Sequence, residues 1–144
     1  MDLINRIIHA ITEVHPLHPM LVHFPIGLSG AALFFILLAL WKNKGFFEQA
    51  AFANIALATV ATLAAGLTGI YDNRVNYLGD APNAGLKVTL AIMLLILTTV
   101  TAVARWRNPD LFNKSRTLYV AAYFLSFGLA LTLAFLGGVI LYGF

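Results

Sequence analysis

Residues 14–41 read VHPLHPMLVHFPIGLSGAALFFILLALW and contain no Lys, Arg, Asp or Glu. A helix needs about 20 mainly apolar residues to cross the hydrocarbon core of a bilayer, with a lower limit near 17. Three further uncharged stretches, residues 49–71, 88–104 and 117–144, reach that length or its lower limit. Together the four stretches predict four membrane-spanning helices.

The composition supports a membrane protein. Of the 144 residues, 60% are hydrophobic and only 10% are charged, whereas soluble domains carry about 25% charged residues. The net charge of +3 arises from basic residues that flank the apolar stretches, so it gives no argument for nucleic-acid binding. The absence of cysteine excludes disulfides, thiolate-bound iron–sulfur clusters and cysteine zinc sites.

Residues 2–14 form a separate amphipathic segment. Apolar and polar residues alternate there with helical spacing, but the segment is too short to span a bilayer. It predicts a helix lying in the membrane interface. The predicted fold is therefore all-α: one membrane domain, residues 1–144, in which the interfacial helix precedes a four-helix transmembrane bundle. The predicted spans are about 20–41, 49–71, 86–106 and 118–143.

Two prolines should shape the start of the first span. Pro19 suits the first turn of the helix, where a missing N–H costs nothing, and Pro25 should kink or loosen the helix by freeing the carbonyl of Leu21.

Small residues mark the predicted helix-packing surfaces. The second span carries Gly66 and Gly69, and the fourth has Ala130, Ala134 and Gly138 at intervals of four. Small residues at this spacing let helix backbones approach closely in lipid.

The basic residues predict the orientation. The loops after the first and third spans share one side of the membrane and carry six Lys or Arg residues, against three on the opposite side. By the positive-inside rule, both termini and the loop of residues 71–87 should lie outside the cytoplasm, and we expect a bacterial inner-membrane location.

Three of the four histidines and three of the five prolines lie at the entrance of the first span. Imidazoles are costly in hydrocarbon, so such a cluster is a candidate site. His18 and His23 are five residues apart, about 140° around an ideal helix. They converge only if the chain bends at Pro19 or Pro25.

The histidine segment admits several interpretations. His18 and His23 could bind b-type haem, although no other span supplies a second histidine. His15, His18, His23 and Asp72, with Asp80 from the same loop, could instead hold a divalent metal ion. The histidines could also bind no cofactor and hydrogen-bond to carbonyls freed by the prolines, as His23 could with Pro19. The spans lack central carboxylates, which disfavours a proton pump. We find no set of catalytic residues, so an enzyme is also disfavoured.

The segment His18-Pro-Met-Leu-Val-His23-Phe-Pro25-Ile-Gly-Leu resembles the hallmark of a bacterial family of four-helix membrane proteins of unknown function. The resemblance extends to Gly66, Gly69 and Asp72 and to Arg105. Relatives fused to, or encoded beside, cytochrome-like or Rieske-type domains imply a redox association through His18 and His23. Many relatives carry a histidine near the start of the third span, where this chain has none.

The sequence thus predicts a small redox-associated membrane subunit that binds haem or a metal ion at the outer end of the bundle. The alternative is a cofactor-free structural or assembly subunit. The partners expected for the protein are the lipid bilayer, a cytochrome or Rieske-type protein and further copies of the chain.

Overall fold

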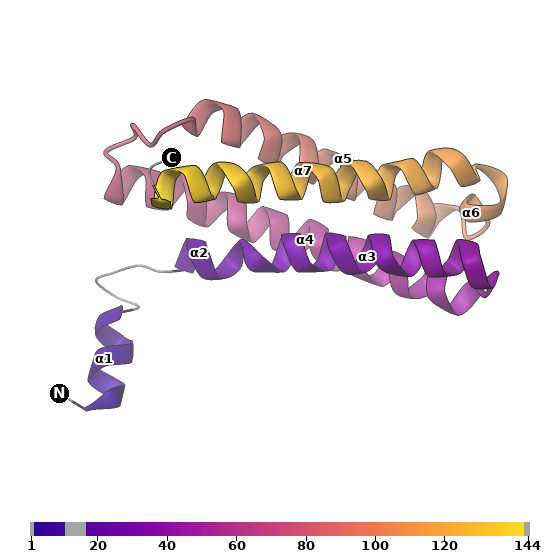
Figure 1. Cartoon of the computed structure of the whole chain (residues 1–144), viewed down its shortest axis with the longest axis horizontal. Coiled ribbons are helices and arrows are strands. Elements are labelled where there is room, and N and C mark those ends of the chain that lie inside the picture. Colours follow the sequence, from indigo (N-terminus) through magenta and orange to yellow (C-terminus); the bar gives the residue numbers. More distant parts are fainter. Residues whose placement is uncertain (1, 11–16, 143–144) are drawn as a thin grey trace.

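The computed structural model describes residues 2–10 and 17–142, with side chains up to residue 139. Within this part of the chain every regular element is a helix (Figure 1). The helices are α1 (Leu3–His9), α2 (Leu17–Leu21), α3 (His23–Lys42), α4 (Gly45–Asn76), α5 (Ala84–Arg107), α6 (Leu111–Lys114) and α7 (Arg116–Tyr142).

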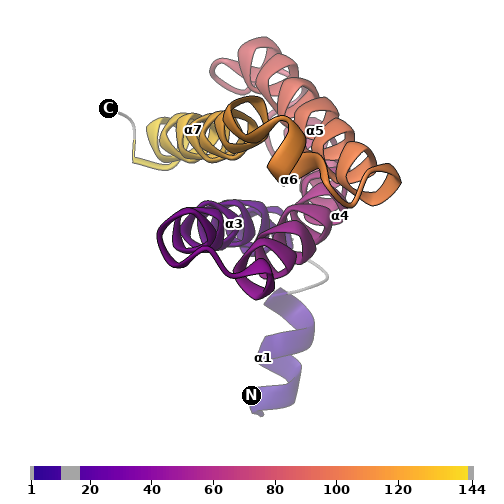
Figure 2. The ribbon, with the colours of Figure 1, turned by 90° about the vertical axis from the view of Figure 1, so that its right-hand side faces the viewer.

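Four segments are long and apolar enough to cross a membrane: Leu17–Lys42, Gly45–Asn76, Ala84–Arg107 and Arg116–Val139. Seen along the bundle they form a ring, in which α3 and α5 each contact both α4 and α7 (Figure 2). Successive long helices run in opposite directions (Figure 1). The prediction of an all-α bundle of four transmembrane helices is confirmed.

The helices extend past the predicted spans, and α4 does so most. Its 32 residues correspond to about 48 Å at 1.5 Å per residue, well beyond a hydrocarbon core of about 30 Å. The excess includes Gly45–Glu48 at its start and the polar turn from Asp72 to Asn76 at its end, both outside the predicted span of 49–71. The short helix α6, in the connection between α5 and α7, was not predicted.

The first span is interrupted where the prolines predicted a loosened helix. Val22 separates α2 from α3 and lies midway between Pro19 and Pro25. Figure 1 shows α2 continuing along the direction of α3, so the interruption does not turn the chain. His18 and His23 consequently do not come together.

The buried positions of the bundle alternate at intervals of three and four residues. In α4 they are Glu48, Ala51, Ile55, Ala58, Thr62 and Ala65. In α3 they are Pro25, Ser29, Ala32, Ile36 and Ala39. This spacing is that of the apolar seam of a coiled coil. The alanines allow the helices to approach closely.

The predicted packing residues have different surroundings. Ala130 is buried, whereas Ala134 and Gly138 are partly exposed. A Cβ at Gly66 would meet nothing within 4 Å, while Gly69 lies against the ring of His18. The packing roles of Gly66, Ala134 and Gly138 stay predictions.

Helix α1 covers the first part of the predicted interfacial segment, and all its apolar side chains are exposed. Figure 1 shows it running across the direction of the bundle rather than along it. Residues 11–16, which include His15 and the rest of that segment, lie outside the described residues.

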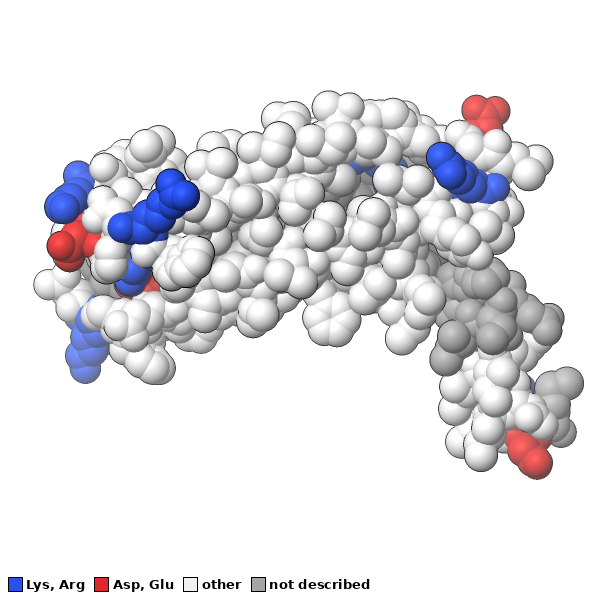
Figure 3. All heavy atoms as spheres, turned by 180° about the vertical axis from the view of Figure 1, so that it is seen from behind, with Lys and Arg blue, Asp and Glu red and all other residues white. Residues whose placement is uncertain are grey.

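Charged side chains gather mainly at the two ends of the bundle, with a largely uncharged surface between them (Figure 3). We call residues 42–49 and 105–123 the basic end, and residues 17–24 and 65–87 the histidine end.

Candidate functional site

The imidazole of His18 joins α2 to α4 at the histidine end. Its Nδ1 atom lies 3.1 Å from the carbonyl oxygen of Ala65 and 3.4 Å from the hydroxyl of Thr68. A carbonyl can only accept a hydrogen bond, so Nδ1 carries the proton and donates it. In the neutral ring Nε2 is then the nitrogen with a free lone pair.

Gly69 makes room for this imidazole. A Cβ built at Gly69 would lie 2.8 Å from Cε1 of His18 and 3.2–3.3 Å from both ring nitrogens. The first distance is shorter than real Cβ contacts, so a side chain here would displace the ring. Gly69 therefore sets the position of His18.

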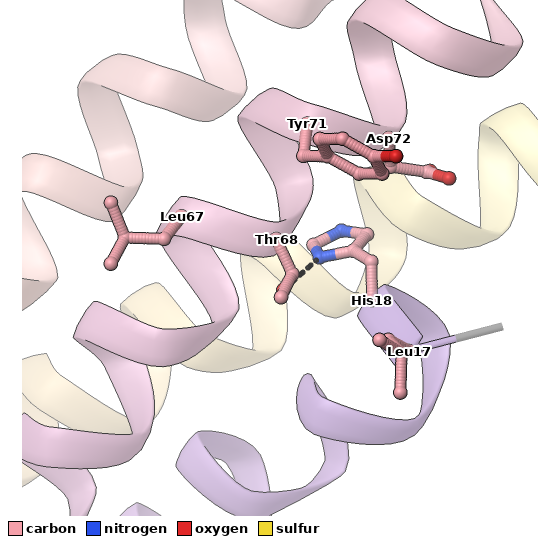
Figure 4. A pocket seen from close by; sticks show the side chains of 6 residues that line it. All are labelled: Leu17, His18, Leu67, Thr68, Tyr71 and Asp72. Atoms are coloured by element: carbon pink, nitrogen blue, oxygen red, sulfur yellow. Dashed lines mark hydrogen bonds between the residues drawn. The ribbon is translucent and has the colours of Figure 1, made fainter. Parts of the chain in front are cut away.

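His18 also lines a small pocket of about 190 Å³ with Leu17, Leu67, Thr68, Tyr71 and Asp72. Figure 4 shows the second ring nitrogen turned toward the side of the pocket where Tyr71 and Asp72 lie. The Asp72 carboxylate accepts a hydrogen bond of 2.5 Å from the side-chain amide of Asn76. The pocket thus brings together two of the predicted site residues, His18 and Asp72.

His23 lies apart from this pocket. It is exposed, and its Nδ1 atom is 2.7 Å from the carbonyl oxygen of Pro19, one turn earlier in the chain. The pairing of His23 with the Pro19 carbonyl is the cofactor-free alternative predicted from the sequence. The bend that would have brought it toward His18 does not form.

In the residues that the structure describes, no group of three or more His, Asp or Glu side chains is placed to hold a metal ion. Of the four predicted ligands, His18 and Asp72 share a pocket, His23 lies elsewhere and His15 falls outside the described range.

The loop that follows α4 is held by Asn73. The side-chain amide of Asn73 donates to the carbonyl of Gly79 at 3.2 Å, and its oxygen accepts from the backbone N–H of Ala81 at 3.0 Å. Gly79 has a φ of +90°, which favours glycine. Asp80 belongs to this turn and does not line the His18 pocket.

A second polar cluster lies at the basic end, where α4, α5 and α7 meet. Arg105 donates from Nε to Oε1 of Glu48 at 2.6 Å and from Nη2 to Oε2 at 2.7 Å. The hydroxyl of Tyr119 donates to Oε1 of Glu48 at 3.0 Å and lies 2.7 Å from the hydroxyl of Tyr123. Glu48, Tyr119 and Tyr123 are all buried. We call these four residues the Glu48 network.

The hydrogen bonds of the Glu48 network compensate the buried negative charge of the Glu48 carboxylate. A two-bond contact between guanidinium and carboxylate is among the strongest hydrogen-bonded arrangements in proteins. Rings pack around it: Tyr119 and Tyr123 meet edge to face at 5.0 Å, and the guanidinium lies 5.4 Å from the Phe52 ring. The network therefore ties three helices together.

The model of the family described as "Predicted membrane protein (DUF2231)" matches residues 14–144. The chain belongs to this family. The match covers the whole bundle and the histidine segment, and it begins after α1. No curated protein and no solved structure matches the chain.

Most of the Glu48 network was not predicted from the sequence of this DUF2231 member. Arg105 entered only through the family resemblance, and Glu48 lies one residue before the predicted second span, which begins at residue 49. Two signals were available: Glu48 borders directly on the apolar stretch, and Tyr119 and Tyr123 are four residues apart on one helix face. The contact itself joins residues 57 apart in sequence.

Proposed function

We propose that this membrane protein is a structural or assembly subunit of a membrane complex, and that its histidine segment fixes the start of the first spanning helix. The observation that carries the proposal is the His18 contact. The ring joins α2 to α4 through the carbonyl of Ala65 and occupies the space left by Gly69.

The second histidine supports the same interpretation. His23 directs Nδ1 to the carbonyl of Pro19 within its own segment, on an exposed face. Each histidine therefore has a backbone acceptor, and the two rings have separate surroundings. Such an arrangement gives a proline-interrupted helix start defined hydrogen bonds.

A second candidate is the redox-associated subunit, and the His18 pocket favours it. Metal-ligating histidines commonly donate one ring N–H to a backbone carbonyl, which leaves the other nitrogen to bind the metal. His18 has this arrangement, and Asp72 and Tyr71 line the same pocket. Haem or a metal ion would bind through His18 as the histidine ligand, and an electron-transfer protein of the cytochrome or Rieske type would be the partner.

We infer an orientation in a bacterial inner membrane with the basic end in the cytoplasm. Six basic residues flank the two connections at that end, against three elsewhere in the chain. The histidine end would then face outward. Cysteine labelling from one side, with Cys introduced at Ser115 or Asn83, tests this, since the chain has no cysteine of its own.

The experiment that separates the two functions compares the full chain in detergent with His18→Ala and His23→Ala. We expect no Soret band in a reduced-minus-oxidised spectrum, no stoichiometric metal, and a clear loss of thermal stability for His18→Ala only. In solubilised membranes the parent should migrate in native electrophoresis as part of a larger assembly, which His18→Ala weakens.

Two outcomes would contradict the structural proposal. A Soret band or bound metal that disappears in His18→Ala would establish the redox candidate instead. A parent chain that migrates only at its own size in native membranes would refute the assembly role.

A further inference from the structure

A second pocket, of about 350 Å³, opens at the basic end beside the Glu48 network. It lies between the connection from α3 to α4 and the segment from the end of α5 through α6. Figure 2 shows the ribbon viewed from this end of the bundle. Its polar lining comprises Lys44, Arg105 and Glu48 and the amide side chains of Asn43, Gln49 and Asn113.

Arg105 has donor capacity that the Glu48 network does not use. Its Nε and Nη2 atoms bind the carboxylate, whereas Nη1 has no partner among the described residues. No buried side-chain nitrogen or oxygen in that part of the chain lacks a partner. Nη1 is therefore accessible, and Arg105 lines the pocket.

The electrostatic balance of the pocket favours an anion. Both carboxylate oxygens of Glu48 already accept hydrogen bonds from Arg105, and one also accepts from Tyr119. Lys44 has no carboxylate partner among the described residues. Lys44 and Arg105 together exceed the single negative charge of Glu48, and the three amide side chains add N–H donors.

The surroundings of the pocket indicate the source of the anion. Phe112 and Pro109 add apolar walls to the pocket, and the exposed rings of Phe46 and Trp106 follow the lining residues Gly45 and Arg105 in the sequence. Tryptophan rings are enriched at the level of lipid headgroups. A ligand with a phosphate and an adjoining acyl chain would match both parts of the surface.

We propose that the pocket formed by Lys44, Arg105, Asn43, Gln49 and Asn113 binds the phosphate of an anionic phospholipid headgroup. Lys44 and Nη1 of Arg105 contact the phosphate oxygens, and the amides donate to the remaining oxygens. The Glu48 network holds Arg105 in place, so the lipid headgroup bridges the start of α4 and the region of α6.

The test uses the full chain in detergent and measures bound lipid by native mass spectrometry. The probes are a phosphatidylglycerol, a phosphatidylcholine with the same acyl chains, and inorganic phosphate. Lys44→Gln removes a cation from the pocket. Lys42→Gln is the matched control, because Lys42 lies 3.7 Å over the Trp41 ring and does not line the pocket.

We expect phosphatidylglycerol to bind in preference to phosphatidylcholine. Lys44→Gln should weaken phosphatidylglycerol binding about fivefold, because loss of one contact with a binding free energy of about 1 kcal/mol corresponds to that factor. Lys42→Gln should leave the affinity unchanged. Asn113→Ala, which removes an amide side chain on α6 from the pocket lining, should weaken binding in the same direction as Lys44→Gln.

Three results would overturn the proposal. Equal losses of lipid affinity in Lys44→Gln and Lys42→Gln would indicate that diffuse surface charge, and not the pocket, binds the lipid. The second result is inorganic phosphate that shows the same loss of affinity in Lys44→Gln and competes fully with the lipid. That result would assign the pocket to a free anion. No preference for phosphatidylglycerol in a folded parent chain would exclude recognition of an anionic headgroup, because both lipids carry a phosphate.

Discussion

At the basic end, α4, α5 and α7 each contribute side chains to one network, whereas at the histidine end a single imidazole joins α2 to α4. Tyr119 and Tyr123 of the basic end also belong to the main core cluster, which includes Ile36 and Ile55 nearer the middle of the bundle. Of the residues that define the histidine end, only Ala65 is buried, and a pocket lies beside His18.

The difference teaches that the two ends of a small bundle can be held together with unequal strength. A buried ion pair that loses one partner leaves an uncompensated charge, so its geometry is difficult to change. One imidazole held by one carbonyl can move at a much smaller cost. Local opening is therefore expected to be easier at the histidine end than at the basic end.

Arg105→Met should produce the largest effect on stability. It leaves the Glu48 carboxylate buried without its cation, which costs about 3–5 kcal/mol when one partner of a buried pair is removed. Thermal unfolding in detergent measures the loss. The double variant Glu48→Gln with Arg105→Met should recover much of the lost stability. If Arg105→Met alone were as stable as the parent, the ion pair would not hold the basic end together.

Gly69→Ala should have an intermediate effect at the histidine end. The added Cβ would displace the His18 ring, and overpacking of this kind costs about 1–3 kcal/mol. Gly66→Ala, one turn earlier, is the matched control, because its Cβ would meet nothing within 4 Å. Equal unfolding temperatures for the two variants would contradict the proposed contact.

Tyr123→Phe should lower the free energy of unfolding by less, about 1 kcal/mol, because it removes one hydrogen bond between neutral groups. It removes the hydroxyl 2.7 Å from that of Tyr119 but leaves the bond from Tyr119 to Glu48. Tyr119→Phe should be more damaging, because its hydroxyl donates to a charged group. The reverse order in thermal unfolding would show that Tyr119 is not the link between α7 and the ion pair.

His23→Ala should have the smallest effect, about 0.5 kcal/mol, the lower limit for a hydrogen bond. His23 is exposed, and its bond to Pro19 stays within one segment. His18→Ala should destabilise the protein more, since it removes a contact between α2 and α4. Equal losses in the two variants, compared by thermal unfolding, would remove the distinction between the two histidines.

The number and approximate location of the spans could be predicted from the sequence, because bilayer thickness fixes the length of an apolar helix. The separation of His18 and His23 also followed from their spacing of five, once the chain did not bend at the prolines. The helix ends were less predictable, since α4 continues through polar residues such as Asn73 and Arg74 to the end of its last turn.

The contacts of the sites could not be predicted in the same way. The buried seam of α4 contains Ala51, Ala58 and Ala65 within an almost uniformly apolar stretch, so hydropathy does not distinguish it from the outer face. The partners of His18 on α4 are 47 and 50 residues away in sequence. Nothing in the local pattern indicates which glycine or carbonyl the ring will reach.

Hydrogen–deuterium exchange of the parent and Arg105→Met in nanodiscs tests the contrast between the two ends most directly. Segments that open locally exchange faster than segments that require global unfolding. We expect residues 17–24 to exchange faster than residues 116–123 in the parent, and Arg105→Met to raise exchange in 45–52 and 116–123 only. Equal exchange at both ends of the parent, or an equal rise at both ends of the variant, would contradict the account.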